Sequence, residues 1–215
     1  ISLEEESDRL IPVLKKIRLK LDVPVSIDTT KPEIARRALE EGAHVINDVS
    51  GLEGGKSREL ADVVKKFQAG LILMHRRGNP ETMQGMTGYS NVAAEVQAEL
   101  EESLKAAREA GLEREQLVID PGLGFAKTAE QNFEIIQNLE RFQSFGVPVL
   151  LGPSRKAFLG QVTGRPVTGP YPSRVFVFQE AELFPWLSVL GNVEFGLRVA
   201  GVPAAKRRAR ALEYL

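Results

Sequence analysis

The sequence predicts an α/β fold: an incomplete TIM (β/α)8 barrel of parallel strands, with a carboxy-terminal tail outside the barrel. Short apolar runs alternate with longer segments in which apolar residues recur every three or four positions, the pattern of strands followed by helices. Polar residues follow these runs, with Gly or Pro close behind. Because parallel βα units place the carboxyl ends of all strands on one face, these polar residues are expected to meet there, which favours an enzyme.

The expected elements follow one another in a regular order. Pro32 stands where the first turn of a helix tolerates its missing N–H, and Gly42 stands where a helix ends. Residues 76–90 are polar and rich in Gly and Pro, so we expect a loop on the active face. The predicted helices cover residues 3–21, 32–41, 60–67, 91–110 and 131–144, and the predicted strands cover 23–28, 44–49, 70–75, 116–120 and 147–151, with a Gly-rich loop at 51–55.

The five predicted strands are fewer than the eight that close a barrel. The chain opens on a helical pattern where a barrel needs a strand, so we expect a truncated or processed amino terminus. Unpaired strand edges favour dimerisation or aggregation, which makes a homodimer one expected state.

Composition narrows the classes of function. The 215 residues are enough for one domain with a hydrophobic core. A formal net charge of -1 gives no reason to expect nucleic acid or an anionic membrane as partner, and we expect no membrane span because no apolar stretch is long enough. The absence of Cys excludes disulfides and Cys-ligated metals and fits a cytoplasmic location.

Two strand ends carry long motifs. Residues 120–128 read Asp-Pro-Gly-Leu-Gly-Phe-Ala-Lys-Thr, and residues 152–160 read Gly-Pro-Ser-Arg-Lys-Ala-Phe-Leu-Gly. Together with Ile-Asn-Asp-Val-Ser-Gly at 46–51 and Leu-Met-His-Arg-Arg-Gly at 73–78, they resemble dihydropteroate synthase, a transferase of folate biosynthesis. We therefore expect residues 1–163 to form a pterin-binding partial barrel.

The resemblance implies a defined reaction. The amine of p-aminobenzoate would displace pyrophosphate from 6-hydroxymethyl-7,8-dihydropterin pyrophosphate. The family implies Mg²⁺ as cofactor, but the segment that usually binds it has no counterpart here, so no residue is assigned as a metal ligand. The family's Arg-Val-His-Asp motif for the leaving pyrophosphate is also missing. We expect weak pterin binding with little or no turnover.

Three strand-end residues are the candidates for holding the pterin ring. Asp120 is rigidly placed before Pro-Gly, and its carboxylate can accept two parallel N–H bonds; its alternative role is to cap the following turn. Asn47 offers a donor and an acceptor, with a turn amide as the alternative. Asp28 is similar to the family's second pterin carboxylate, or it caps the next helix.

The second motif supplies the candidates nearest to the reacting atoms. Lys156 matches the family lysine beside the pterin and is expected to be catalytic, with a solvated surface lysine as the alternative. Arg155 is expected either to bind substrate or to form a structural ion pair. Ser154 resembles the residue that borders the p-aminobenzoate site, and Gly152 is expected to bind substrate beside it.

Two apolar residues complete the candidate site. Phe125 is expected to pack on the ring of p-aminobenzoate, and Met74 resembles a residue that lines the pterin pocket. Core packing is the alternative for both. His75 is expected to be a hydrogen-bonded structural residue, and Arg76 replaces the Met that commonly follows it in the family.

Residues 164–215 have a different character. Val-Phe-Gln-Glu at 177–180 and Leu-Phe-Pro-Trp-Leu at 183–187 resemble the Gln-loop region of an ABC-transporter ATPase of the nitrate, sulfonate or taurine type. The chain has no Gly-x-x-x-x-Gly-Lys-Ser/Thr loop for nucleotide phosphates. We expect a chimera or a sequence artefact joined near residues 163–166. An ABC ATPase fragment and a non-catalytic α/β scaffold are the alternative functions.

Overall fold

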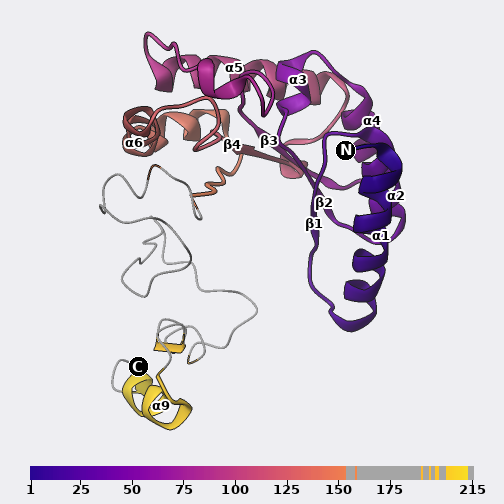
Figure 1. Cartoon of the computed structure of the whole chain (residues 1–215), viewed down its shortest axis with the longest axis vertical. Helices are drawn as coiled ribbons and strands as arrows, with labels where there is room; N and C mark the ends of the chain where they lie inside the picture. The colour runs from indigo at the N-terminus through magenta and orange to yellow at the C-terminus, as the bar shows by residue number, and fades with distance from the viewer. Residues whose placement is uncertain (154–157, 159–189, 191–193, 195–196, 199–201, 213–215) are drawn as a thin grey trace. The chain divides into compact units, whose positions relative to one another are not determined.

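The structure is a computed structural model that describes residues 1–153, 158, 190, 194, 197–198 and 202–212. The chain divides into two compact units, residues 1–166 and 167–215 (Figure 1). This division falls close to the expected junction, and the origin of the second unit stays a prediction.

The first unit is built on a parallel four-stranded sheet with strand order β1-β2-β3-β4. Each strand pairs with the next one along the chain, so every crossover moves one strand further in the same direction. This is the progression of a barrel wall rather than of a doubly wound sheet. The strands are β1 (Ser26–Asp28), β2 (Val45–Asp48), β3 (Gly70–Met74) and β4 (Leu117–Asp120).

The predicted helices at 3–21, 32–41, 60–67 and 91–110 are present with small shifts at their ends. Polar side chains cap four of the described helix starts: Ser2 accepts from the N–H of Glu5, Ser50 from that of Glu53, Asn91 from that of Ala94, and Thr128 from that of Gln131. None of the described helices is long and apolar enough to cross a bilayer. The helices are α1 (Leu3–Lys20), α2 (Pro32–Glu40), α4 (Glu59–Lys66), α5 (Val92–Glu109), α6 (Ala129–Gln137) and, in the second unit, α9 (Ala204–Leu212).

The predicted Gly-rich loop at 51–55 is instead a single left-handed helical turn, α3 (Gly51–Gly55), with a φ of 55° at both Leu52 and Glu53. A Cβ at Gly51 would lie 2.7 Å from the carbonyl oxygen of Met74, and one at Gly55 would lie 2.7 Å from that of Glu102. Glycine is therefore required at both ends. The Leu52 side chain is only 1% exposed, and its burial offsets the strain of the left-handed backbone at this residue.

The expectations for the end of the barrel segment were partly wrong. Among the described residues, the predicted strand at 147–151 pairs only through one bridge between Ile119 and Val149. Pro148 accepts from the N–H of Ile119 but has no N–H of its own to extend the ladder. The predicted helix at 131–144 also ends early, at Gln137, and a 3₁₀ segment (Leu139–Phe145) follows. Two further 3₁₀ turns cover Met83–Gly85 and Arg114–Gln116.

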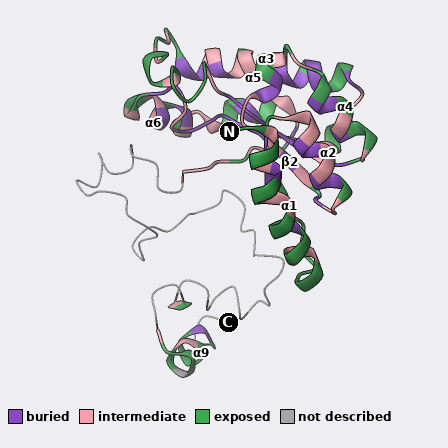
Figure 2. Ribbon diagram, turned by 45° about the vertical axis from the view of Figure 1, so that its right-hand side comes forward, coloured by how far each residue is buried: buried purple, intermediate pink, exposed green. Residues whose placement is uncertain are grey.

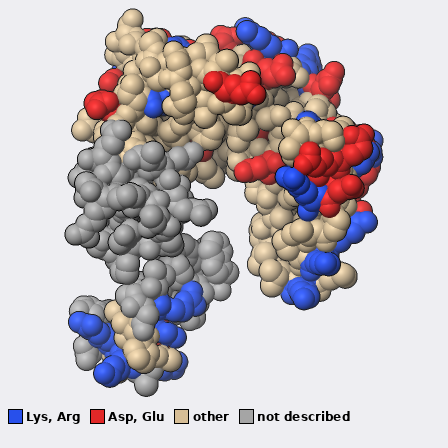
Figure 3. Space-filling view, in the orientation of Figure 1, with Lys and Arg blue, Asp and Glu red and all other residues tan. Residues whose placement is uncertain are grey.

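One face of the sheet packs against helices and forms the core. Figure 2 shows the buried residues concentrated between the strands and the covering helices. Acidic and basic side chains are interspersed over the outer helices of the first unit in Figure 3. The sheet residues that face the helices are Ile27, Ile46, Leu71, Leu73, Leu117 and Ile119, all of them buried.

Candidate functional site

Four predicted binding residues lie at or next to the carboxyl ends of the four strands. Asp28 pairs in register with Asn47, and Met74 pairs with Asp120. Asn47 stands opposite Ile72, two positions before Met74. Because side chains alternate along a strand, all four project to the face opposite the helix-packed core. The structure therefore brings these predicted residues together along one edge of one face.

The pair on β1 and β2 leaves a buried acceptor unsatisfied. The Nδ2 of Asn47 donates to Oδ1 of Asp28 at 2.5 Å. The Oδ1 of Asn47 is buried and has no hydrogen-bond partner among the described residues. An unpaired buried acceptor costs about 1–3 kcal/mol, so it indicates a position for a ligand N–H. The turn-amide alternative for Asn47 leaves this atom unexplained.

Asp120 lies on β4 with 7% of its surface exposed. Its Oδ1 accepts from the N–H of Gly122 at 2.8 Å, so the turn-capping role considered as an alternative is present. Oδ2 lies 3.8 Å from where a Cβ on Gly152 would stand. The predicted Gly152 therefore borders the carboxylate of Asp120.

The loop after β4 presses against the residue after β3. A Cβ on Gly122, whose φ is +69°, would lie 1.9 Å from the carbonyl oxygen of His75, so only glycine fits. Gly124 and Ala126 also have positive φ, at 79° and 50°. Phe125 is half-buried in this loop, and its N–H donates to the carbonyl of Gly122. The core-packing alternative for Phe125 is thus only partly met.

Sequence reasoning missed a buried lysine beneath this loop. Lys127 is 5% exposed, and its Nζ donates to the carbonyls of Gly122 at 3.1 Å and Phe125 at 3.0 Å. The same ammonium lies 2.9 Å from Nδ1 of His75. Nε2 of His75 lies 2.8 Å from a carboxylate oxygen of Glu99 on α5. The expectation that His75 is hydrogen-bonded is confirmed, and its structural role stays a prediction.

Charge states along this chain of contacts follow from burial. Desolvation lowers the pKa of His75 to about 4, with the Lys127 ammonium adding to the effect. The imidazole is therefore neutral at pH 7. Since an ammonium is only a donor, Nδ1 accepts from it and Nε2 carries the proton donated to Glu99. Burial raises the pKa of Glu99, but hydrogen bonds from His75 and Arg77 outweigh it and lower this pKa to about 2.

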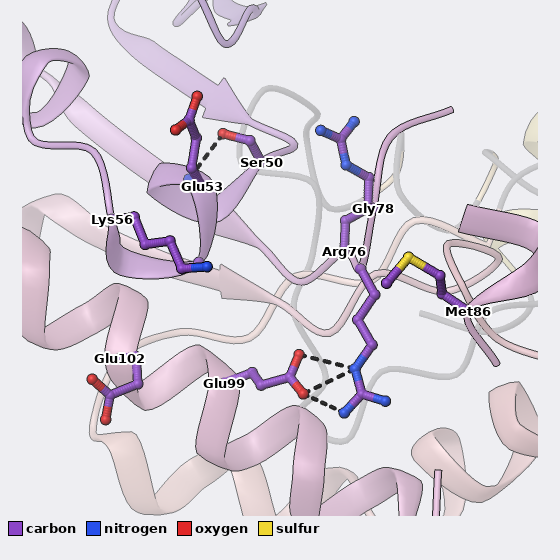
Figure 4. Close-up of a pocket in the computed structure, with 10 residues that line it drawn as sticks. Ser50, Glu53, Lys56, Arg76, Gly78, Met86, Glu99 and Glu102 are labelled. Carbon is purple, nitrogen blue, oxygen red and sulfur yellow. Dashed lines mark hydrogen bonds and ion pairs between the residues drawn. The ribbon is translucent and has the colours of Figure 1, made fainter. Parts of the chain in front are cut away.

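A pocket of about 450 Å³ lies away from this face, between α3, the loop after β3 and α5. None of the predicted binding residues that the structure describes lines it. Its wall carries both signs of charge, and Glu99 is ion-paired with Arg77 there. Figure 4 shows the lining residues Ser50, Glu53, Lys56, Arg76, Gly78, Met86, Glu99 and Glu102.

The residues predicted nearest to the reacting atoms, Ser154, Arg155 and Lys156, lie outside the described residues. For the Mg²⁺ implied by the resemblance, the described part of the chain contains no group of three or more His, Asp or Glu side chains that could hold a metal ion. Asp28 and Asp120 stand at opposite ends of the strand order. The residues described here therefore do not fit a metal site.

The chain belongs to the pterin-binding enzymes: residues 1–208 match the family described as Pterin binding enzyme. It is 44% identical over 166 residues to the dihydropteroate synthase of Synechocystis sp., covering 77% of this chain and 57% of that protein. The family match runs past the expected junction near residue 163, whereas this pairwise match covers only part of the chain.

Solved structures agree with this membership. Dihydropteroate synthase from Stenotrophomonas maltophilia superposes with a TM-score of 0.72 at 42% identity, covering 77% of this chain and 61% of that one. The Xanthomonas albilineans enzyme in complex with 7,8-dihydropteroate has a TM-score of 0.70 at 38% identity, covering 77% and 59%. This chain spans less than two thirds of the length of these relatives. The expected α/β fold of parallel strands is confirmed, and its barrel is incomplete within the part of the chain that the structure describes.

Proposed function

We propose that this chain carries the pterin-binding part of a dihydropteroate synthase. The observation that carries the proposal is the buried, unpaired Oδ1 of Asn47, which lies on the same sheet face as the carboxylates of Asp28 and Asp120. A pterin has N–H donors and ring acceptors along one edge, which match two carboxylates and an amide. The complex of the Xanthomonas albilineans relative with 7,8-dihydropteroate supports a pterin as ligand.

In the proposed reaction, the amine nitrogen of p-aminobenzoate attacks the methylene carbon of the pterin pyrophosphate. The new C–N bond forms as the C–O bond breaks, pyrophosphate leaves with the electron pair, and the amine loses a proton. The described residues contribute binding and orientation, which lower the barrier by holding the reactants in line. The pterin ring would be held by Asp28, Asn47 and Asp120, and Met74 would line the same pocket. Phe125 would face p-aminobenzoate.

Lys156, Arg155, Ser154 and Gly152 are proposed to complete the substrate site, with Lys156 beside the reacting centre. A cation there would favour the negative charge that develops on pyrophosphate. Mg²⁺, a homodimer and a cytoplasmic location remain predictions. The ABC ATPase alternative depends on residues 177–187, which lie outside the described residues.

Ligand-dependent thermal stabilisation tests the proposal. 6-Hydroxymethylpterin is expected to raise the unfolding temperature of the wild-type chain in a concentration-dependent way, since a ligand that binds only the folded state stabilises it. ATP serves as the matched control and is expected to have no effect. Stabilisation by ATP alone would favour the ABC ATPase alternative, and stabilisation by neither would favour a non-catalytic scaffold.

A further inference from the structure

Two electrostatic costs oppose a charged lysine at position 127. Its side chain is almost fully buried, although a buried ammonium is costly unless it is well paired. It also directly precedes Thr128, the N-cap of α6, where the positive end of the helix dipole opposes a cation. A lysine held against both costs indicates that its contacts are needed in the folded chain.

Those contacts brace the loop that follows Asp120. Lys127 donates to the carbonyls of Gly122 and Phe125, so one ammonium joins two points of the loop. We call these two hydrogen bonds the clamp. The N–H of the same Gly122 donates to Oδ1 of Asp120. Gly122 and Gly124 have positive φ, and such glycines make a loop pliable. The clamp therefore acts next to the Asp120 carboxylate and on the backbone of Phe125 itself.

The clamp is connected to the loop after β3 through a series of hydrogen bonds and ion pairs. Lys127 contacts His75, His75 contacts Glu99, and Glu99 is ion-paired with Arg77. Arg77 also pairs with Glu95 at 2.8 Å and stacks on Tyr89 at 3.8 Å from the ring centroid. The two cations are matched by two carboxylates on α5. The loop after β4 is thereby tied to the residues after β3 and to a helix.

We propose that Lys127 is a positioning residue for pterin binding. It holds the Asp120 carboxylate and the Phe125 ring in their binding arrangement without touching the ligand. This inference rests on the proposed function, because it concerns the affinity of the same site.

The test compares affinity with stability in the full chain. Lys127→Met keeps the length of the side chain but removes the charge and its donors. We expect folded Lys127→Met to bind 6-hydroxymethylpterin about tenfold to a hundredfold more weakly, because a displaced Asp120 carboxylate would lose its charge-assisted hydrogen bonds to the pterin. Val64→Ala, a core change on α4, is the matched control: it lowers the unfolding temperature but keeps wild-type affinity. Fluorescence titration and thermal unfolding measure the two properties.

Two further variants keep the inference falsifiable. If Lys127→Met does not fold, Lys127→Arg retains the charge but presents a planar fork in place of a compact ammonium, and it is expected to fold with at least a severalfold loss of affinity. Because the chain has no Cys, Lys127→Cys can be alkylated with 2-bromoethylamine while unfolded and then refolded. The restored ammonium is expected to recover wild-type affinity.

The outcomes are distinguishable. Wild-type affinity in folded Lys127→Met or Lys127→Arg, or an equal loss in Val64→Ala, would overturn the positioning role while leaving the proposed function intact. Absence of pterin binding by the wild-type chain would refute the proposed function, and the positioning role with it.

Discussion

Replacing Asn47 with alanine should separate a ligand-binding amide from a structural one. In the folded chain, the variant loses the hydrogen bond from Nδ2 to the exposed Asp28, worth about 1 kcal/mol. It also removes the buried, unpaired Oδ1, which relieves a cost of about 1–3 kcal/mol. The two terms offset each other, so the free energy of unfolding is expected to change by no more than about 1–2 kcal/mol.

Pterin affinity is expected to respond differently. Oδ1 of Asn47 would accept a ring N–H, and loss of that bond is expected to weaken the dissociation constant by about tenfold or more. Urea unfolding and pterin titration of the same preparations measure both quantities. Asn138→Ala is the control, because it removes an amide outside the candidate site that donates to the carbonyl of Glu134 on α6. A destabilised Asn47→Ala variant with wild-type affinity would refute the reasoning and restore the turn-amide alternative.

Two stability predictions concern the contact between the β3 and β4 loops. Burial lowers the pKa of His75 from 6.5 to about 4, so the unfolded chain takes up this proton at a higher pH than the folded chain. The free energy of unfolding should therefore fall by up to about 3 kcal/mol as the pH drops from 6.5 to about 4. His75→Gln should flatten the slope in urea titrations; a wild-type slope that is already flat contradicts this. Gly122→Ala is expected to cost about 3 kcal/mol or more, whereas Gly85→Ala, with open space around it, should change stability by about 0.5 kcal/mol or less. Equal unfolding midpoints would contradict the close approach of Gly122 to His75.

Much of the fold could be predicted because its signals are local. Apolar periodicity, Pro32 and Gly42 predicted helices and strands close to those observed. The convergence of Asp28, Asn47, Met74 and Asp120 was also predictable, because parallel strands that run in chain order end on one face.

The features that sequence reasoning missed depend on long-range contacts. The left-handed turn at 51–55 is set by the close approach of Gly51 to Met74 and of Gly55 to Glu102. The buried contact of Lys127 with His75 joins residues that are 52 positions apart in the chain. A lysine within a Gly-rich motif gives no local sign of burial. The weak strand at 147–151 could have been anticipated from Pro148, which has no N–H for a ladder.

Calorimetric titration of 6-hydroxymethylpterin into the wild-type chain and into Asp120→Asn tests the central claim most directly. Asp120→Asn keeps an oxygen for the Gly122 N–H but removes the charge and one acceptor. The account predicts saturable binding to the wild-type chain and a loss of at least about tenfold in folded Asp120→Asn. No binding to the folded wild-type chain, or equal affinity in both proteins, would contradict it.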